Sequence, residues 1–272
     1  MSIFIPKLRK LIDFCHIYSV YFNPSDFHIL KPNGAKRKIT KFSHQAKYAQ
    51  TLLNNILDKI ESPSYRYCRK KQDGVGYDNI HNAKHHSKSR KAITLDLENF
   101  FPNTTKSEII KFFQEFSIFR NTLSTEEIES IIRFTCCESG IGLAQGSRCS
   151  SNLAFWTNYK MFNGLYNLAQ KNNLLFTVYV DDITFSGDEI PAKFIIEVKK
   201  SVRMYGHRIK DSKTHYSSRK KGINITGILV KKDKIQPNSK FFEKGKVKNP
   251  NVKPYLKRIY KILSQQLQND SP

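Results

Sequence analysis

Two apolar segments that lie far apart in the chain each run into aspartates, and this pattern constrains the fold more than any other feature. Residues 174–180 predict a buried strand that ends at Asp181 and Asp182, and residues 183–186 continue past them. This arrangement predicts a hairpin with two carboxylates at its bend. Residues 92–97 form a second buried strand pattern, which carries Asp96 near its end. Only tertiary folding can bring the two segments together.

Charged residues in apolar strands need a physical reason. An ionised carboxylate that is buried without a partner costs free energy, so strands that keep such residues indicate a bound cation. Asp is also a common turn residue, and Asp181 with Asp182 taken alone fits an ordinary polar turn. The apolar flanks and the matching strand around Asp96 favour a functional site.

The rest of the chain predicts an α+β fold. Apolar residues repeat at helical spacing in residues 43–60, and capping boxes that begin at Thr105 and Ser124 each open a helix. We expect a mainly antiparallel sheet backed by helices on one face, with the acids on the other face. The other predicted elements are a hairpin around the turn at 32–34, a helix over 153–162, a helix whose first residue is Pro191, a strand over 223–230 and a helix over 255–267.

The charge of the chain indicates its partners. It has 46 Lys and Arg against 23 Asp and Glu, a formal net charge of +23, which bound nucleic acid would offset. A basic membrane-surface protein is the competing interpretation, but no basic amphipathic helix dominates the sequence. No run approaches the roughly 20 apolar residues of a membrane helix, and the N-terminal apolar stretch ends too early for a secretory signal. We therefore expect a cytoplasmic protein that binds nucleic acid, with no membrane partner.

Basic residues are concentrated between residues 231 and 261, where they alternate with aromatic residues. Cations follow phosphates, and aromatic rings stack on unpaired bases. A solvated helix face over an apolar stripe is the alternative, but it does not explain why residues 244–269 contain no acid. The residues assigned to nucleic acid in this segment are Lys244, Lys246, Lys248, Lys253, Lys257 and Arg258.

The aspartates also indicate a chemistry. Converging carboxylates without histidine or cysteine partners suit magnesium, a hard ion that prefers oxygen ligands. Two such ions roughly 3.5–4 Å apart stabilise the attacking and leaving oxygens of an in-line phosphoryl transfer. We therefore expect two Mg²⁺ ions at Asp96, Asp181 and Asp182.

Six short motifs, in order along the chain, resemble those of bacterial retron reverse transcriptases. They extend from about Lys36 to Val230, roughly seven-tenths of the 272 residues. Each match is weak alone, and their common order makes the set specific. The matches are Asn82-Ala-Lys-His-His86 to N-A-x-x-H, Leu95-Asp-Leu-Glu-Asn-Phe-Phe-Pro102 to the first palm motif, Leu143-Ala-Gln-Gly-Ser147 to the L-P-Q-G loop, Tyr179-Val-Asp-Asp182 to Y-x-D-D, Lys213-Thr214 to the lysine-threonine pair and Ile225-Thr-Gly227 to V-T-G.

The resemblance implies a right-hand polymerase, with fingers over residues 1–90, a palm over 91–228 and a short basic thumb over 229–272. It implies metal binding by the three aspartates with the Leu97 carbonyl as an added ligand, and it gives Lys213 a catalytic role at the pyrophosphate. The implied nucleotide-binding residues are Arg37, Lys38, Phe101, Gln145, Gly146 and Tyr179. The implied nucleic-acid-binding residues are Asn82, His85, His86, Arg148, Thr226 and Gly227.

Two of these assignments have structural alternatives. Phe101 would exclude a ribose 2′-hydroxyl by its bulk and so select deoxynucleotides. Core packing explains an aromatic residue equally well, and one of Phe100 and Phe101 must be core. Arg37 suits a triphosphate through its forked donors, or else it lies at a solvated hairpin tip.

The resemblance also implies partners. Such an enzyme would copy part of a cognate structured noncoding RNA from dNTPs, start from a guanosine 2′-hydroxyl, leave a branched RNA–DNA hybrid and act with a separate effector protein against phages. The alternatives are another bacterial defence or group II intron-like reverse transcriptase with different priming, and a non-catalytic RNA-binding scaffold. Retention of all three aspartates disfavours the scaffold.

The sequence departs from the family pattern in two places. Ala144, Arg148 and Ser151 replace the usual prolines of the L-P-Q-G loop, so we expect a less rigid loop with an added charge. Val180 stands where retron enzymes more often have Ala. These changes leave the metal site intact and bear on fidelity and template handling.

Overall fold

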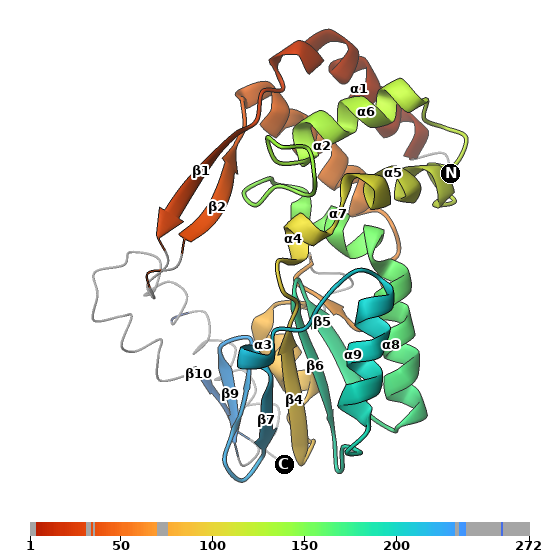
Figure 1. Ribbon diagram of the computed structural model, residues 1–272. Coiled ribbons are helices and arrows are strands. Elements are labelled where there is room, and N and C mark those ends of the chain that lie inside the picture. The colour runs from red at the N-terminus through yellow and green to blue at the C-terminus, as the bar shows by residue number, and fades with distance from the viewer. Residues whose placement is uncertain are drawn as a thin grey trace. The chain divides into compact units, whose positions relative to one another are not determined.

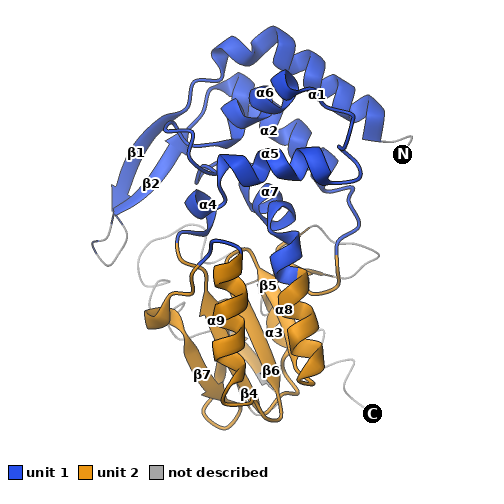
Figure 2. Cartoon of the chain, turned by 45° about the vertical axis from the view of Figure 1, so that its right-hand side comes forward, with its two compact units in different colours: residues 1–62, 99–162, 205–207 blue, residues 63–98, 163–204, 208–272 orange. Residues whose placement is uncertain are grey.

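The computed structural model describes residues 4–30, 34, 36–69, 76–231, 234–237 and 257. The chain divides into two compact units, which are coloured separately in Figure 2. The first unit comprises residues 1–62, 99–162 and 205–207, and the second comprises residues 63–98, 163–204 and 208–272. The subdomain boundary expected at residue 90 therefore falls inside the second unit.

The first unit is mainly helical (Figure 1). Both predicted capping boxes are confirmed: the Thr105 and Ser124 side chains accept hydrogen bonds from the backbone N–H groups of Glu108 and Glu127, whose carboxylates bond back. The predicted 43–60 helix is also confirmed, with Ser43 as its N-cap. The helices are α1 (Phe4–Tyr18), α2 (His44–Leu57), α4 (Phe100–Asn103), α5 (Lys106–Glu115), α6 (Thr125–Thr135) and α7 (Ser150–Thr157), with a 3-10 turn η1 (Ser19–Tyr21).

A hairpin completes the first unit. Strands β1 (Ser25–Leu30) and β2 (Lys36–Lys41) pair antiparallel along their whole length, with Leu30 opposite Lys36. The predicted hairpin is therefore confirmed, and its three basic residues begin the second strand.

A five-stranded sheet forms the centre of the second unit. Its strand order is β3-β5-β6-β4-β7. The pairs β5–β6, β6–β4 and β4–β7 are antiparallel, and β3 pairs parallel with β5, which confirms the mainly antiparallel sheet. The strands are β3 (Arg66–Tyr67), β4 (Lys91–Asp96), β5 (Leu175–Tyr179), β6 (Asp182–Gly187) and β7 (His215–Ser218).

One face of this sheet is covered by two long helices, α8 (Tyr159–Lys171) and α9 (Phe194–Met204), which Figures 1 and 2 show side by side. Phe176 and Phe185 of the sheet are buried and lie 5.1 Å apart between ring centroids. Phe185 also packs edge-on against Phe194 of α9 at 4.9 Å. These contacts confirm that helices back the sheet.

Helix α3 (Asn79–His85) and a small three-stranded sheet form a second layer of this unit. Ile80, Ala92, Ile225 and Val230 belong to one buried apolar cluster that joins α3, β4 and the small sheet. The small sheet contains β8 (Ile223–Ile225), β9 (Ile228–Lys231) and β10 (Lys234–Pro237).

Three predicted elements differ from the structure. Residues 223–230 form a hairpin and not one strand, because Thr226 and Gly227 adopt left-handed backbone angles, with φ of 45° and 84°. The helix over 153–162 is interrupted at Asn158, whose buried amide donates to the Thr104 hydroxyl at 3.0 Å. Helix α9 begins at Phe194, three residues after Pro191.

Two further predictions concern the ends of the chain and membranes. The helix over 255–267 lies outside the described residues except for Lys257, which is helical and exposed. Within the described ranges, no helix has the length and apolar character needed to cross a bilayer.

Candidate active site

Asp96 and Asp182 are directly opposite each other on the paired strands β4 and β6. Alternate residues of a strand share one face, so Thr94 and Thr184, which also pair, lie on the same face as the two aspartates. Asp181 occupies the two-residue turn between β5 and β6. The folded chain thus brings Asp96 next to the Asp181–Asp182 hairpin, as the two strand patterns predicted.

The turn has an unusual backbone. Val180, its first residue, has a φ of 61°, a left-handed angle that β-branched residues disfavour. The backbone N–H of Leu97 donates to the Asp181 carbonyl at 3.0 Å. This bond ties the end of β4 to the turn and holds the carboxylates in register.

A second segment closes around the end of β4. The N–H of Lys210 donates to the Asp96 carbonyl at 2.9 Å, and the N–H of Glu98 donates to the Arg208 carbonyl at 2.8 Å. The following 3-10 turn, η2 (Asp211–Lys213), places the Lys213 ammonium on the Asp96 carboxylate, where the two form an ion pair. The Asp96 side chain is 13% exposed and that of Lys213 is 53% exposed, so the pair is open to solvent from the lysine side.

The carboxylates perturb one another. Burial raises the pKa of Asp182 to about 7, and the charges of Asp181 and Asp96 add to this rise, while Lys213 opposes it. Like charges that are this close destabilise one another's ionised forms. A cation at this position would relieve that repulsion.

The fit of these residues to magnesium rests on donor chemistry. All three candidate ligands are carboxylates, the oxygen donors that hard divalent cations prefer. Among the described residues, however, no group of three or more His, Cys, Asp and Glu side chains is arranged to hold a metal ion. The Asp96 carboxylate instead binds Lys213, so the shared ligation by three aspartates is not formed in this conformation.

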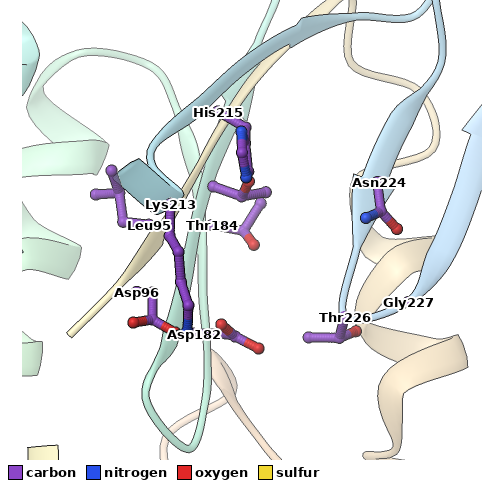
Figure 3. Close-up of a pocket in the computed structure, with 10 residues that line it drawn as sticks. Leu95, Asp96, Asp182, Thr184, Lys213, His215, Asn224, Thr226 and Gly227 are labelled. Carbon is purple, nitrogen blue, oxygen red and sulfur yellow. Dashed lines mark hydrogen bonds and ion pairs between the residues drawn. The ribbon is translucent and has the colours of Figure 1, made fainter. Parts of the chain in front are cut away.

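A pocket of about 190 Å³ adjoins Asp96 and Asp182 (Figure 3). In Figure 3, the Lys213 side chain reaches down to Asp96, and the β8–β9 hairpin forms the opposite wall. Besides Asp96, Asp182 and Lys213, the pocket is lined by five residues with polar side chains. They are Thr94, Thr184, His215, Asn224 and Thr226.

The sequence reasoning missed four of these lining residues. Thr94 and Thr184 lie two residues from Asp96 and Asp182, so the strand alternation that exposed the aspartates was a signal for them. His215 pairs with Thr94 across β4 and β7. Asn224 carries no local signal, because the hairpin that presents it was predicted as one strand.

Three of the nucleotide-binding residues predicted in the first unit, Arg37, Lys38 and Gln145, line a second pocket of about 370 Å³, together with Lys36; Phe101 and Gly146 are not among its lining residues. The N–H of Thr40 on β2 donates to the Gln145 carbonyl at 2.8 Å. The structure therefore joins the basic strand to the glutamine loop.

Gly146 permits this close approach. Its φ is 108°, and a Cβ there would lie 3.0 Å from the Thr40 carbonyl oxygen. Any other residue would be strained in this conformation and would press on β2. The left-handed backbone and the close approach of β2 thus explain why glycine occupies position 146 of the predicted loop.

Lys38 is held by an acid that the sequence analysis did not single out. Its ammonium lies 2.8 Å from Asp26 on β1, and the Thr40 hydroxyl donates to the same carboxylate at 2.7 Å. These hydrogen bonds with Lys38 and Thr40 outweigh burial and lower the pKa of Asp26. Asp26 was identifiable as one of two acids in the first forty residues.

The two phenylalanines after Asp96 differ in environment. Phe100 is buried, at 2% exposure, against Phe162 and His207, while Phe101 is partly exposed. One of the pair is therefore core, as expected, and Phe101 is the one available to a substrate. Tyr179 is partly buried and hydrogen-bonds to the Cys68 side chain.

The structure corrects two of the predicted nucleic-acid contacts. His86 is completely buried, and its ring nitrogens bond to the Ser186 and Thr177 hydroxyls at 2.6 and 2.8 Å. Asn82 is 1% exposed. In this conformation neither side chain is accessible to RNA, and the two bonds of His86 tie the end of α3 to strands β5 and β6. His85, between them in the motif, is exposed.

The other predicted contacts vary in what the structure describes. Thr226 and Gly227 form the tip of the β8–β9 hairpin and line the pocket beside Asp182. Arg148 is exposed, and its guanidinium donates to the Thr51 hydroxyl at 3.1 Å. Lys244, Lys246, Lys248, Lys253 and Arg258 lie outside the described residues.

The described geometry places paired acids and a lysine at one end of the neighbouring strands β4 and β6, inside a mainly antiparallel sheet. A model of the reverse transcriptase (RNA-dependent DNA polymerase) family matches residues 29–230. The chain therefore belongs to the reverse transcriptase family. The active-site strands, the Gln145 loop and the β8–β9 hairpin all lie within the matched range.

Within this family, the chain is similar to retron enzymes, which confirms the resemblance inferred from the six motifs. It is 29% identical over 233 residues to the retron Se72 reverse transcriptase of Salmonella heidelberg (strain 579083-10), covering 82% of this chain and 59% of that protein. It is 26% identical over 226 residues to the retron Ec86 reverse transcriptase of Escherichia coli, covering 80% and 67%. The retron Mx162 reverse transcriptase of Myxococcus xanthus is 23% identical over 228 residues, covering 74% and 46%. The chain thus spans about half to two thirds of the length of these relatives.

Proposed function

We propose that this chain is a retron-type RNA-directed DNA polymerase that copies part of a cognate structured noncoding RNA into DNA. The observation that carries the proposal is the cross-strand pair Asp96–Asp182, with Asp181 in the adjoining turn and Lys213 on Asp96. In the proposed right-hand architecture, residues 1–90 form fingers, 91–228 a palm and 229–272 a short basic thumb.

Two magnesium ions would be held by Asp96, Asp181 and Asp182, with the Leu97 carbonyl as a further ligand. When bound, they would activate the primer hydroxyl and neutralise charge on the phosphates. A metal ion on Asp96 would displace the Lys213 ammonium, because two cations side by side on one carboxylate repel each other. The half-exposed lysine then becomes free to donate a proton to the departing pyrophosphate.

The first-unit residues would bind the incoming dNTP. Arg37 and Lys38 would supply positive charge for the triphosphate. Before the nucleotide binds, the ion pair with Asp26 holds the Lys38 ammonium in place. Gln145 and Gly146 would lie against the nucleotide and template base, because the loop that carries them is bonded to β2. Phe101 would exclude ribonucleotides by its bulk, and Tyr179 would support the nucleotide from β5.

The proposed RNA contacts lie at least partly at the surface. Within the described part of the chain, His85 and Arg148 are exposed, Thr226 and Gly227 are partly exposed at the tip of the β8–β9 hairpin, and Lys257 is an exposed helical residue. The further contacts Lys244, Lys246, Lys248, Lys253 and Arg258 rest on the sequence. Priming from a guanosine 2′-hydroxyl, a branched RNA–DNA product, a separate effector protein, antiphage defence and a cytoplasmic location complete the proposal.

Primer extension on an RNA template with Mg²⁺ tests the catalytic assignment. We expect Asp181→Asn and Asp182→Asn to lose at least about a thousandfold in incorporation rate, because each removes a charged ligand from the reacting centre. Asp188→Asn, an exposed acid paired with Arg90, is the matched control and should keep the parent rate. If Asp181→Asn incorporates nucleotide as fast as the parent protein, the assignment is wrong.

Sequencing of nucleic acid that copurifies with the protein tests the retron type. A short DNA joined 2′–5′ to RNA is the expected product. Bulk cellular RNA without attached DNA would instead indicate different priming or a non-catalytic RNA-binding scaffold.

A further inference from the structure

Exposed aromatic side chains gather where helices α1 and α2 of the first unit pack together. The Phe14 ring lies 4.6 Å from that of Tyr18 on the same helix and 4.8 Å from that of Tyr48 on α2, between ring centroids. Tyr18 is 36% exposed and Tyr48 is 42% exposed. Single exposed aromatic residues are common, but two exposed tyrosines that both pack on the partly buried Phe14 form an aromatic surface that needs an explanation.

Cations flank this aromatic cluster. Lys10 precedes Phe14 by four residues, and Phe14 precedes Tyr18 by four, so the three lie along one face of α1. Lys47 is the neighbour of Tyr48 on α2, and its carbonyl accepts the Thr51 hydroxyl at 2.9 Å. We call the surface made by Lys10, Phe14, Tyr18, Lys47, Tyr48 and Arg148 the α1–α2 strip.

Arg148 connects the strip to the proposed nucleotide site. Its guanidinium donates to the Thr51 hydroxyl at 3.1 Å, and its backbone N–H donates to the Gln50 side chain at 3.2 Å. It follows Gln145 by three residues in the same loop. Thr51 in turn donates to the Lys47 carbonyl, so Arg148 lies against the same helix that carries Lys47 and Tyr48, and α2 packs on α1 within one unit.

The acids near the strip are few. Asp13 is the one acid on α1. On the side of α1 that faces α6, His16 lies 3.9 Å from Glu127. The aromatic side of α1 carries Lys10 and no acid in its Lys10–Phe14–Tyr18 row, so the charge of the strip suits a polyanion.

We propose that the α1–α2 strip binds the unpaired template strand as it approaches the polymerase site. This inference rests on the proposed polymerase function and adds a binding surface to it. Alternating cations and rings bind single strands without regard to sequence, because every nucleotide offers a phosphate and a base face. Eight residues separate Lys10 from Tyr18, a rise of roughly 12 Å, which matches about three nucleotides of a stacked strand. A paired duplex offers no free base faces, so the strip distinguishes unpaired from paired template.

Fluorescence anisotropy with two RNA–DNA duplexes tests the proposal. One duplex is blunt, and the other carries eight unpaired uridines at the template 5′ end. We expect the parent protein to bind the overhang duplex about tenfold more tightly than the blunt one, from the stacking of one or two bases. The double variant Tyr18→Ser/Tyr48→Ser should lose this advantage and bind the two duplexes equally.

Two further variants separate stacking from folding. Tyr18→Phe/Tyr48→Phe keeps both rings and should keep the overhang advantage. Tyr205→Ser removes a tyrosine of similar exposure, 38%, outside the strip, and it should behave as the parent does. A duplex with one unpaired template nucleotide is too short to reach the strip but can still template one addition. If the double variant extends this duplex at the parent rate, the polymerase function stands, whatever the binding measurements show for the strip.

The proposal is overturned if the parent protein shows no overhang advantage, or if the double variant retains it. It is also overturned if the double variant weakens binding of both duplexes equally. Ile17 and Val20, 65% and 69% exposed, adjoin the strip and would favour a protein contact. Conversion of a dimer to a monomer by the double variant, with RNA affinity unchanged, would therefore identify a protein interface and reject the template-binding role.

Discussion

The Lys213 ammonium lies on the Asp96 carboxylate, directly across the strand pair from Asp182. The chain thus supplies its own cation to the acid that we propose as a metal ligand. Lys213 and a divalent ion compete for one carboxylate, so a change in one must alter the affinity of the other.

Lys213→Gln should increase the affinity for Mg²⁺ several-fold, because it removes both a competitor for Asp96 and a repelling charge. The same change should slow nucleotide incorporation by about a hundredfold or more through loss of proton donation. Calorimetric titration of the protein with Mg²⁺ measures the first effect. Lys220→Gln makes the same charge change at an exposed position after β7 and should alter neither quantity. Weaker Mg²⁺ binding in Lys213→Gln would contradict competition.

Gly146→Ala should raise the KM for dNTPs at least about tenfold, with a smaller effect on kcat. The new Cβ would meet the Thr40 carbonyl oxygen at 3.0 Å, and a φ of 108° strains any L-residue, which costs about 1–3 kcal/mol of stability. Steady-state kinetics and thermal unfolding measure the two effects. Gly140→Ala is the control in the same loop, since its φ of 66° is also left-handed but nothing lies within 4 Å of its Cβ position, so the two variants differ in the close contact. Equal KM values for the two variants would remove the argument for close approach.

Phe101→Ala should allow ribonucleotide incorporation and leave the fold intact, because Phe101 is partly exposed. Phe100→Ala should instead cost about 3–5 kcal/mol of unfolding free energy, since that ring is 2% exposed among other aromatic side chains. Competition between dATP and ATP measures the first effect, and chemical denaturation measures the second. A Phe101→Ala enzyme that still rejects ATP would refute the steric assignment.

His86 should make the protein less stable as the pH falls. Burial lowers the pKa of His86 to about 3, whereas in the unfolded chain it is about 6.5. Between those pH values the unfolded state binds more protons than the folded state. The contribution of His86 to the free energy of unfolding is therefore fully present above about pH 6.5 and declines as the pH falls below it. Unfolding free energies of the parent should fall by up to about 1.4 kcal/mol per pH unit more than those of His86→Gln. The exposed His28 offers the control: His28→Gln should keep the parent slope.

The sequence predicted most of the second unit because its central strands have strong local patterns. The apolar runs around Asp96 and before Asp181 correspond to β4 and β5, and the aspartates meet as the hairpin required. The β8–β9 hairpin was missed because a left-handed Thr226 is rare, and Gly227 alone is a weak turn signal. Its position beside Asp182 depends on tertiary packing that no local pattern contains.

Residue roles inferred from motifs alone agreed less well with the structure. His86 matched a motif that suggested RNA contact, yet it is satisfied internally by two hydroxyls that lie about a hundred residues further along the chain. Asp26 attracted no attention in the sequence, although it holds Lys38. In both cases the partner side chains belong to other elements of the fold, so the roles of His86 and Asp26 could be recognised only in the folded structure.

The left-handed Val180 in the turn between β5 and β6 has a consequence for how the molecule matures. Isolated from the rest of the protein, the segment from Tyr179 to Asp182 would prefer another conformation, because the β-branched side chain of Val180 disfavours a left-handed backbone angle. The end of β4 must be in place, with the Leu97 N–H donating to the Asp181 carbonyl, before the hairpin can hold its shape. A chain in which β4 has not yet joined the β5–β6 hairpin would therefore not hold Asp181 and Asp182 in the geometry proposed for catalysis.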